Sequence, residues 1–191
     1  MSPQFIDDQT FQAINFNQTT LKKGTYENCE FHNCNFTTIN LGNINFVDCQ
    51  FYHCDFSNAK LMETGIQNSH FQHCKLIGLH FDNCHTFLFA PTFKNCKLDF
   101  SSFHKMDLKK CIFRACSLES VDFGNANLSK IDLEECNLSN AIFKQTNLTE
   151  TDFRTAINFN IELTENQLSK AKFSLVSLPN LLRKYNLTIE K

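Results

Sequence analysis

The sequence is poor in the residues that build common catalytic loops. Its 191 residues include only 5 glycines and no tryptophan, and they contain neither a glycine-rich phosphate loop nor a nucleophile elbow. No pair of carboxylates stands out as a general acid and base. We therefore expect a protein that is not an enzyme and that needs no cofactor.

Long hydrophobic runs are absent as well, so the sequence predicts no membrane-spanning segment. The start, MSPQFIDDQT, has neither the basic region nor the apolar run of a signal peptide. We expect no membrane association and a cytoplasmic location, where the 10 cysteines stay reduced.

What the sequence has instead is a hydrophobic residue at every fifth position. This series runs from Phe11 to Phe81, shifts by two residues, resumes from Leu88 to Phe153, and continues more loosely to Phe173. Neither a helix nor a strand returns to the same face after five residues. The chain must therefore turn a corner in every repeat.

Residue type also repeats after twenty positions, as in Phe11, Phe31, Phe51 and Phe71. Four five-residue repeats per coil give a square solenoid in which like residues stack about 4.8 Å apart. We predict an all-β solenoid over residues 11–175, with about eight coils and a length of roughly 40 Å. Residues 1–10 are then a lead-in.

The cysteines lie two residues before a fifth-residue position, where a small side chain also points inward. They are Cys29, Cys34, Cys49, Cys54, Cys74, Cys84, Cys96, Cys111, Cys116 and Cys136. Their expected role is that of buried apolar fillers, so no catalytic thiol is expected. His53 and His73 fall at solvent-facing corners while their cysteine neighbours face inward, so no four-ligand metal site is expected.

Two interruptions break the five-residue series. Residues 82–91 contain the two-residue insertion, for which two structures are open: a bulged corner with Phe87 or Phe89 folded back on the coil, or a projecting loop that presents an aromatic side chain to a partner. Asn158 interrupts the second part of the series. It predicts an irregular last coil at residues 156–167.

The C-terminal tail, residues 176–191, contains a pattern typical of a short helix. From Ser177 to Asn186 there is a serine N-cap, a proline in the first turn and basic residues in the last. One face carries Leu178, Leu181, Leu182 and Tyr185. This face could cap the last coil, but it exceeds what one coil end requires, so we favour a two-fold C-terminal homodimer.

The repeats Ala126-Asn127-Leu128-Ser129, Cys136-Asn137-Leu138-Ser139 and Thr151-Asp152-Phe153-Arg154 resemble the A(D/N)LXX pattern of the pentapeptide repeat family. The break, the stretch from Phe93 to Phe123 and the terminal LPNLLRKYNLTIE resemble its topoisomerase-protecting, Qnr-, MfpA- and McbG-like subset. This resemblance implies a right-handed quadrilateral β-helix that dimerises through its C-terminus. It also implies a DNA mimic that binds DNA gyrase or topoisomerase IV, counters quinolones or a gyrase-targeting toxin, and does not itself bind nucleic acid.

A DNA mimic needs negative outer faces, because a DNA-binding saddle is built to neutralise phosphates. The net charge is only -2, but residues 115–165 carry nine acidic against three basic residues. We predict partner contacts at Glu119, Asp122, Asp132, Glu134, Glu135 and Asp152, together with Phe87 and Phe89. Residues 94–114 depart from this pattern, with six basic against two acidic residues. They leave open a general β-helical scaffold for an unidentified protein partner.

Overall fold

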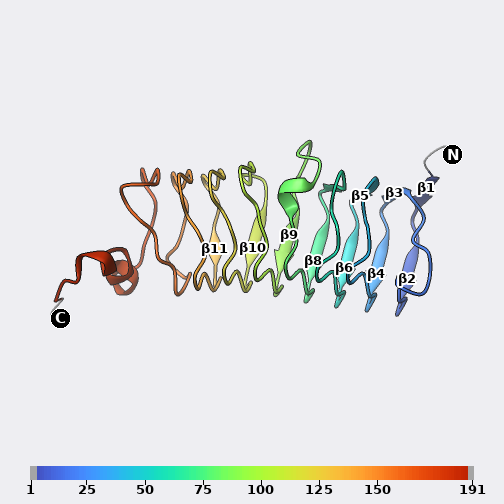
Figure 1. The fold of residues 1–191 in the computed structure, drawn as a ribbon, viewed down its shortest axis with the longest axis horizontal. Helices are drawn as coiled ribbons and strands as arrows, with labels where there is room; N and C mark the ends of the chain where they lie inside the picture. The colour runs from blue at the N-terminus through green and yellow to red at the C-terminus, as the bar shows by residue number, and fades with distance from the viewer. Residues whose placement is uncertain (1–3, 189–191) are drawn as a thin grey trace.

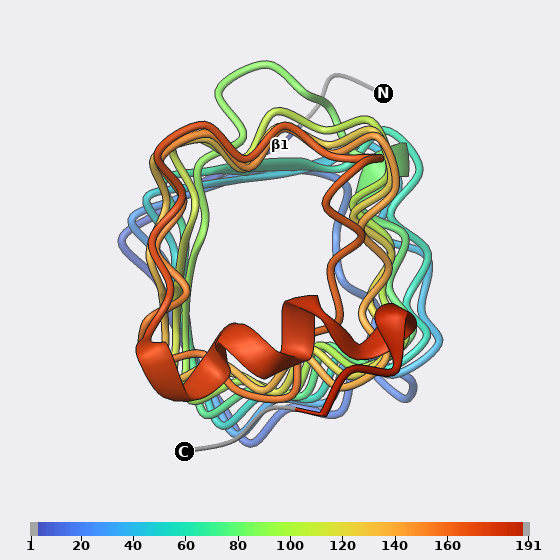
Figure 2. The same cartoon turned by 90° about the vertical axis from the view of Figure 1, so that its left-hand side faces the viewer.

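The computed structural model describes residues 4–188 and shows an elongated parallel β-solenoid, with its two termini at opposite ends (Figure 1). Seen along the solenoid axis, the backbone follows the four sides of a square (Figure 2). The predicted all-β solenoid of four repeats per coil is confirmed.

Strands are assigned on two of the four sides, and all their pairings are parallel. The four-stranded sheet contains β1 (Gln4–Asp7), β3 (Gly24–Glu27), β5 (Ile44–Val47) and β7 (Gly65–Gln67). The seven-stranded sheet contains β2 (Thr10–Gln12), β4 (Glu30–His32), β6 (Gln50–Tyr52), β8 (His70–Gln72), β9 (Thr92–Lys94), β10 (Ile112–Arg114) and β11 (Leu133–Glu134). Isolated bridges continue the stack to Lys172.

Strand β1 lies in the segment that the sequence analysis assigned to a lead-in. It pairs in register with β3, because Ile6 already stands five residues before Phe11 and extends the series by one repeat. Gly24, with φ at 151°, allows the backbone of β3 to lie close to that of β1, because a Cβ at this position would lie 2.0 Å from the carbonyl oxygen of Gln4. The first coil therefore begins at β1.

The core is a set of aromatic columns that follow the twenty-residue period. Phe51 stacks on Phe31 with ring centroids 4.8 Å apart and on Phe71 at 4.7 Å. Within a coil the rings meet edge to face, as for Phe51 and Phe56 at 5.2 Å. Both geometries are favourable for aromatic pairs. The rings therefore stabilise contacts between successive coils and between adjacent sides of one coil.

The corners explain how a chain with few glycines can turn so often. The residue two positions after each inward-facing side chain recurrently has a positive φ, as at Asn33, His53 and Asn125. Asparagine tolerates this conformation better than most residues. The outward residue before each corner helps as well, since Asn35 Oδ1 accepts a hydrogen bond from the backbone N–H of Thr37 at 2.9 Å.

All ten cysteines are buried and carry free thiols, as expected for small inward-facing fillers. Six of them form one continuous column: Cys34, Cys54, Cys74, Cys96, Cys116 and Cys136. The thiols of the first five donate to backbone carbonyls one coil earlier, and the Cys96 thiol reaches the Phe71 carbonyl at 3.3 Å across the insertion. Burial raises the pKa of Cys49, which lies outside this column, to about 12 and keeps that thiol protonated.

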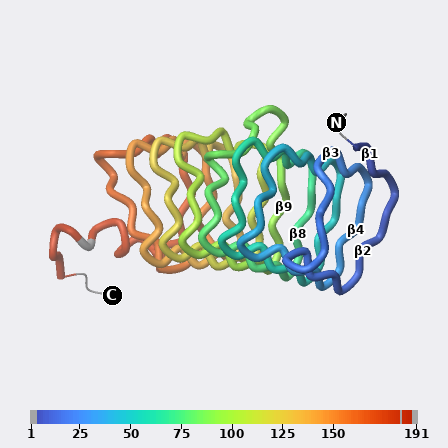
Figure 3. The backbone as a smooth tube through the Cα atoms, turned by 45° about the vertical axis from the view of Figure 1, so that its right-hand side comes forward, coloured from blue at the N-terminus to red at the C-terminus, as the bar shows by residue number. Residues whose placement is uncertain are grey.

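The two-residue insertion contains both structures left open by the sequence. Phe89 folds back into the core and is 5% exposed, whereas Phe87 is 75% exposed on a loop that projects from the solenoid (Figures 2 and 3). The expectation that the series resumes at Leu88 is wrong. Leu88 has φ at 57° and is 48% exposed, because the extra residues and the short 3-10 helix η1 (Phe81–Asn83) delay the inward position to Phe89.

The coil at residues 156–167 departs from the regular repeat over part of its length. Asn158 takes a positive φ, and Phe159 instead fills the core beside Phe153, with ring centroids 5.4 Å apart. The chain returns to register at Gln167, which bridges Asn147 one coil earlier.

The C-terminal segment folds as two 3-10 helices, η2 (Leu175–Leu181) and η3 (Arg183–Tyr185). The predicted N-cap at Ser177 is wrong: Ser174 is the N-cap, and its hydroxyl accepts a hydrogen bond from the Ser177 N–H at 3.2 Å. Pro179 has no N–H to donate to the carbonyl of Leu175, which disfavours an α-helix in this register. An ion pair between Lys184 and Glu162 ties η3 to the last coil.

Candidate partner-binding surfaces

The predicted acidic residues do not lie on one side of the solenoid. Asp132, Glu134 and Asp152 share the side of the seven-stranded sheet, and Asp132 bridges Asp152. Glu119 lies at the next side of the square, two residues after Ser117, which bridges Lys97 and Asn137 in the adjacent coils. Asp122 lies on the side after that, where it bridges Ser102 and Ile142. The six carboxylates are therefore distributed over three sides rather than along one stripe.

Two of these carboxylates have strong cationic partners within the chain. Arg154 Nη2 donates to Asp152 Oδ2 at 2.7 Å, and Lys172 Nζ lies 3.6 Å from the same oxygen. Arg114 Nη2 donates to Glu134 Oε1 at 2.8 Å. These pairs offset the negative charge of Asp152 and Glu134. The twenty-residue period could have revealed them, because Arg114 precedes Glu134 by one coil and Lys172 follows Asp152 by one coil.

The remaining acids are in different surroundings. Asp122 Oδ2 lies 3.5 Å from His104 Nδ1. Desolvation, with the neighbouring charges of Asp152 and Glu134, raises the pKa of Asp132 above its ordinary value. Within residues 4–188, Glu119, Asp132 and Glu135 form no ion pair. These three carboxylates are the ones left to attract a cationic partner.

The Asp152 pair gives a testable pH effect. Hydrogen bonding from Arg154 holds the pKa of Asp152 below its ordinary value of 3.8. A carboxylate with a lowered folded-state pKa adds stability above its unfolded pKa of about 4, and this stability is lost as the pH falls through the folded value. We expect Arg154→Gln to raise the Asp152 pKa in a carboxyl NMR titration. Arg114→Gln is the matched control and should leave it unchanged; equal titration of Asp152 in all three proteins would contradict the assigned cause.

The projecting loop adjoins a basic area. A hollow of about 370 Å³ lies beneath it, lined by Thr86, Leu88, Phe89, Asp107, Lys109 and Lys110. The ammonium group of Lys109 is 3.2 Å from the Asp107 carboxylate. Of the two aromatic residues predicted to contact a partner, only Phe87 is accessible, because Phe89 belongs to the core.

The residues predicted to form the dimer have different roles in the single chain. Leu181 is buried and caps the last coil, Leu182 is half-buried, and Leu178 and Tyr185 are exposed. The largest exposed apolar fractions in this segment belong to Leu175 and Val176, at 83% and 91%. Both residues precede Ser177, the predicted start of the helix, and so lie outside the predicted apolar face. The segment therefore both caps the coil and presents an apolar surface.

Within residues 4–188, no group of three or more histidine, cysteine, aspartate or glutamate side chains is arranged to hold a metal ion. His53 and His73 stack face to face on the outer surface, with ring centroids 4.9 Å apart, while Cys54 and Cys74 lie inside. None of the helices in this part of the chain has the length and apolar character required to cross a bilayer.

Comparison with solved structures finds the same fold at low identity. A trypsin-treated variant of QnrB1, a plasmid-mediated fluoroquinolone resistance protein, gives a TM-score of 0.64 at 18% identity over 98% of both chains. HetL, a pentapeptide repeat protein involved in heterocyst differentiation regulation from the cyanobacterium Nostoc sp. strain PCC 7120, gives 0.67 at 14% identity over 90% of this chain and 84% of HetL. No curated protein sequence matches significantly.

The family comparison is more specific than these structural likenesses. The family model described as pentapeptide repeat region matches residues 44–118 and 87–173, which together cover more than half of the chain. The matched segments contain the insertion and most of the buried aromatic columns and of the cysteine column. The chain therefore belongs to the pentapeptide repeat family.

Proposed function

We propose that the chain is a non-catalytic binding protein that occupies the DNA-binding surface of a type II topoisomerase, DNA gyrase or topoisomerase IV. In this role it modulates the enzyme or protects it from a quinolone or a gyrase-targeting toxin. The proposal is carried by three outward carboxylates that form no ion pair in the described part of the chain: Glu119, Asp132 and Glu135. They lie on the coils toward the C-terminal end of a straight rod (Figure 1). The shared fold with QnrB1 supports it.

The physical basis is competition for one cationic surface. A protein that binds duplex DNA neutralises phosphates with lysine and arginine side chains, and a rigid rod with outward carboxylates can engage the same groups. The basic residues at 94–114 limit the negative surface to the coils that follow them. We therefore assign the contact to residues 115–165 and not to the whole length of the rod. A topoisomerase partner also requires a cytoplasmic location.

A supercoiling assay tests this proposal. Purified protein is titrated into DNA gyrase acting on relaxed plasmid, with and without a fluoroquinolone. We expect inhibition of supercoiling, or fewer drug-stabilised cleavage complexes. No effect of micromolar protein on either readout, with the protein folded by circular dichroism, would exclude the topoisomerase function.

Pairing of two chains through the C-terminal segment would bring their acidic coils together around a two-fold axis. The exposed side chains of Leu175, Val176, Leu178 and Tyr185 provide an apolar surface for this contact. We expect Leu175→Glu with Val176→Glu to lower the mass of the sedimenting species. Ile112→Glu with Ile142→Glu, on exposed side chains of the coils, is the matched control. An unchanged mass in the tail variant would contradict a C-terminal dimer.

The exposed loop favours a second function, that of a scaffold for another protein partner. Phe87 is a large apolar side chain held in solvent by a loop on a rigid frame, which is typical of a recognition residue. Phe87→Ser should weaken that partner's binding and leave folding intact, since Phe87 contributes little to the core. A pull-down that compares the Phe87→Ser variant with the parent protein measures this binding. Gyrase inhibition by both proteins is recorded in parallel. Loss of the partner with unchanged gyrase inhibition separates the two functions; equal capture by both proteins would exclude a role for Phe87.

A further inference from the structure

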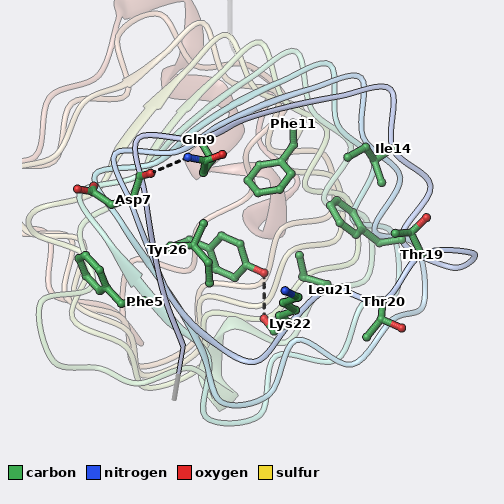
Figure 4. A pocket seen from close by; sticks show the side chains of 12 residues that line it. Phe5, Asp7, Gln9, Phe11, Ile14, Thr19, Thr20, Leu21, Lys22 and Tyr26 are labelled. Atoms are coloured by element: carbon green, nitrogen blue, oxygen red, sulfur yellow. Dashed lines mark hydrogen bonds between the residues drawn. The ribbon is translucent and has the colours of Figure 1, made fainter. Parts of the chain in front are cut away.

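The N-terminal end of the solenoid is open in the described part of the chain. A pocket of about 430 Å³ lies at its mouth, where Phe11, Leu21 and Tyr26 lie within the ring of the first coil (Figure 4). Phe11 and Leu21 are only half-buried, whereas Phe31 and Leu41, one coil later, are fully buried. At the opposite end, Leu181 covers part of the core. The first coil thus presents apolar surface that the rest of the chain buries.

The same end presents two unpaired strand edges. Within residues 4–188, β1 and β2 are the terminal strands of their sheets, and each pairs with a strand on one side only. Proteins usually protect such edges with lysine, proline or a bulge. Neither strand contains lysine or proline, since their sequences are QFID and TFQ. The backbone of this coil can therefore accept a further strand.

Charges at the two ends of β1 indicate which strand it accepts. Asp7 and Asp8 lie at its C-terminal end, and Lys22 and Lys23 lie beside its start, where the Gln4 N–H donates to the Lys23 carbonyl at 3.4 Å. All four charged side chains are exposed. The Lys23 ammonium group donates to the carbonyls of Asn40 and Gly42 in the next coil, so Lys22 is the lysine positioned to meet a second copy. If a second β1 runs antiparallel to the first, the acidic end of each strand lies beside the basic end of the other. The edge is therefore complementary to itself.

We propose that two copies of the chain pair head to head through this end, with their β1 strands antiparallel across a two-fold axis. Each copy covers the apolar mouth of the other, and Asp8 of one copy faces Lys22 of the partner subunit. This contact is isologous, so one patch serves both subunits. It does not depend on topoisomerase binding. Together with a C-terminal dimer, it would join the rods end to end.

Sedimentation velocity on the full chain carrying Leu175→Glu and Val176→Glu isolates the N-terminal contact, because the C-terminal apolar surface is then charged. We expect a reversible dimer whose dissociation constant rises with salt concentration. A monomer at every concentration up to the submillimolar range would overturn the proposal, as would a dimer that salt leaves unchanged. If this end of the solenoid binds a different protein instead of a second copy, the purified chain would sediment as a monomer, and the proposal would be overturned.

A charge-exchange experiment then locates the contact. In the same background, Asp8→Lys or Lys22→Glu places like charges opposite each other, and we expect either variant alone to dimerise roughly tenfold more weakly. Mixing the two variants restores opposite charges at both positions, so the mixture should dimerise as the parent does. Lys60→Glu, far from the mouth, is the matched control. Separate variants that both dimerise with the parent's affinity, or a mixture that dimerises no better than either variant alone, would exclude this interface.

Discussion

Replacing Phe51 with alanine should lower the free energy of unfolding by about 3–5 kcal/mol, the range for truncating a buried phenylalanine. Phe51 is fully buried and lies between Phe31 and Phe71 in one column. It also meets Phe46 and Phe56 edge to face, at 5.2 Å in both cases. The substitution therefore removes contacts to three coils and leaves a cavity that a stacked backbone cannot close.

The matched control is the same substitution at the projecting loop. Phe87→Ala removes an equal side chain that is 75% exposed, so its effect should stay within about 0.5 kcal/mol. Chemical denaturation followed by circular dichroism measures both variants. Similar losses at the two positions would contradict the assignment of the aromatic columns as the source of stability.

Reversing three carboxylates should weaken gyrase binding by about a hundredfold or more, at roughly 1–2 kcal/mol for each reversed contact. The variant carries Glu119→Lys, Asp132→Lys and Glu135→Lys, the predicted contact acids that form no ion pair within residues 4–188. Lysine is tolerated at such corners, since Lys105 and Lys130 already adopt a positive φ like that of Glu135. Binding is measured by surface plasmon resonance on immobilised gyrase.

Asp152 and Glu134 are left unchanged in this variant. Asp152 is buried and bonded to Arg154, so its reversal would destabilise the fold and confuse loss of binding with loss of structure. The control, Glu27→Lys with Asp48→Lys and Glu63→Lys, makes the same charge change on the N-terminal coils. Equal affinity losses in both triple variants would show a net-charge effect and not a contact at residues 115–165.

The five- and twenty-residue periods account for most of what could be predicted. They determine which side chains face inward, and the buried cysteines and aromatic columns follow directly. The same periods bring Arg114 over Glu134 and Lys172 over Asp152, so the loss of free negative charge was also readable from the sequence. A count of acidic residues along the chain does not reveal this loss, because the basic partner of Glu134 and one partner of Asp152 lie one coil away.

The irregular positions could not be predicted in the same way. At the insertion, Leu88 and Phe89 are both hydrophobic, and only the path of the loop determines that Phe89 enters the core. In the last coil, Phe159 takes the place expected of residue 158 for the same reason. Where the period breaks, the inward position depends on how the backbone returns to register, and local sequence does not specify that path.

Competition with DNA tests the central functional claim most directly. A fluorescently labelled duplex is bound to gyrase, and the purified protein is added while fluorescence anisotropy is recorded. Occupation of the DNA-binding surface predicts complete displacement of the duplex, with a midpoint that moves to higher protein concentration as the DNA concentration rises. A duplex that stays bound while the protein itself binds gyrase would contradict DNA mimicry and place the contact elsewhere on the enzyme.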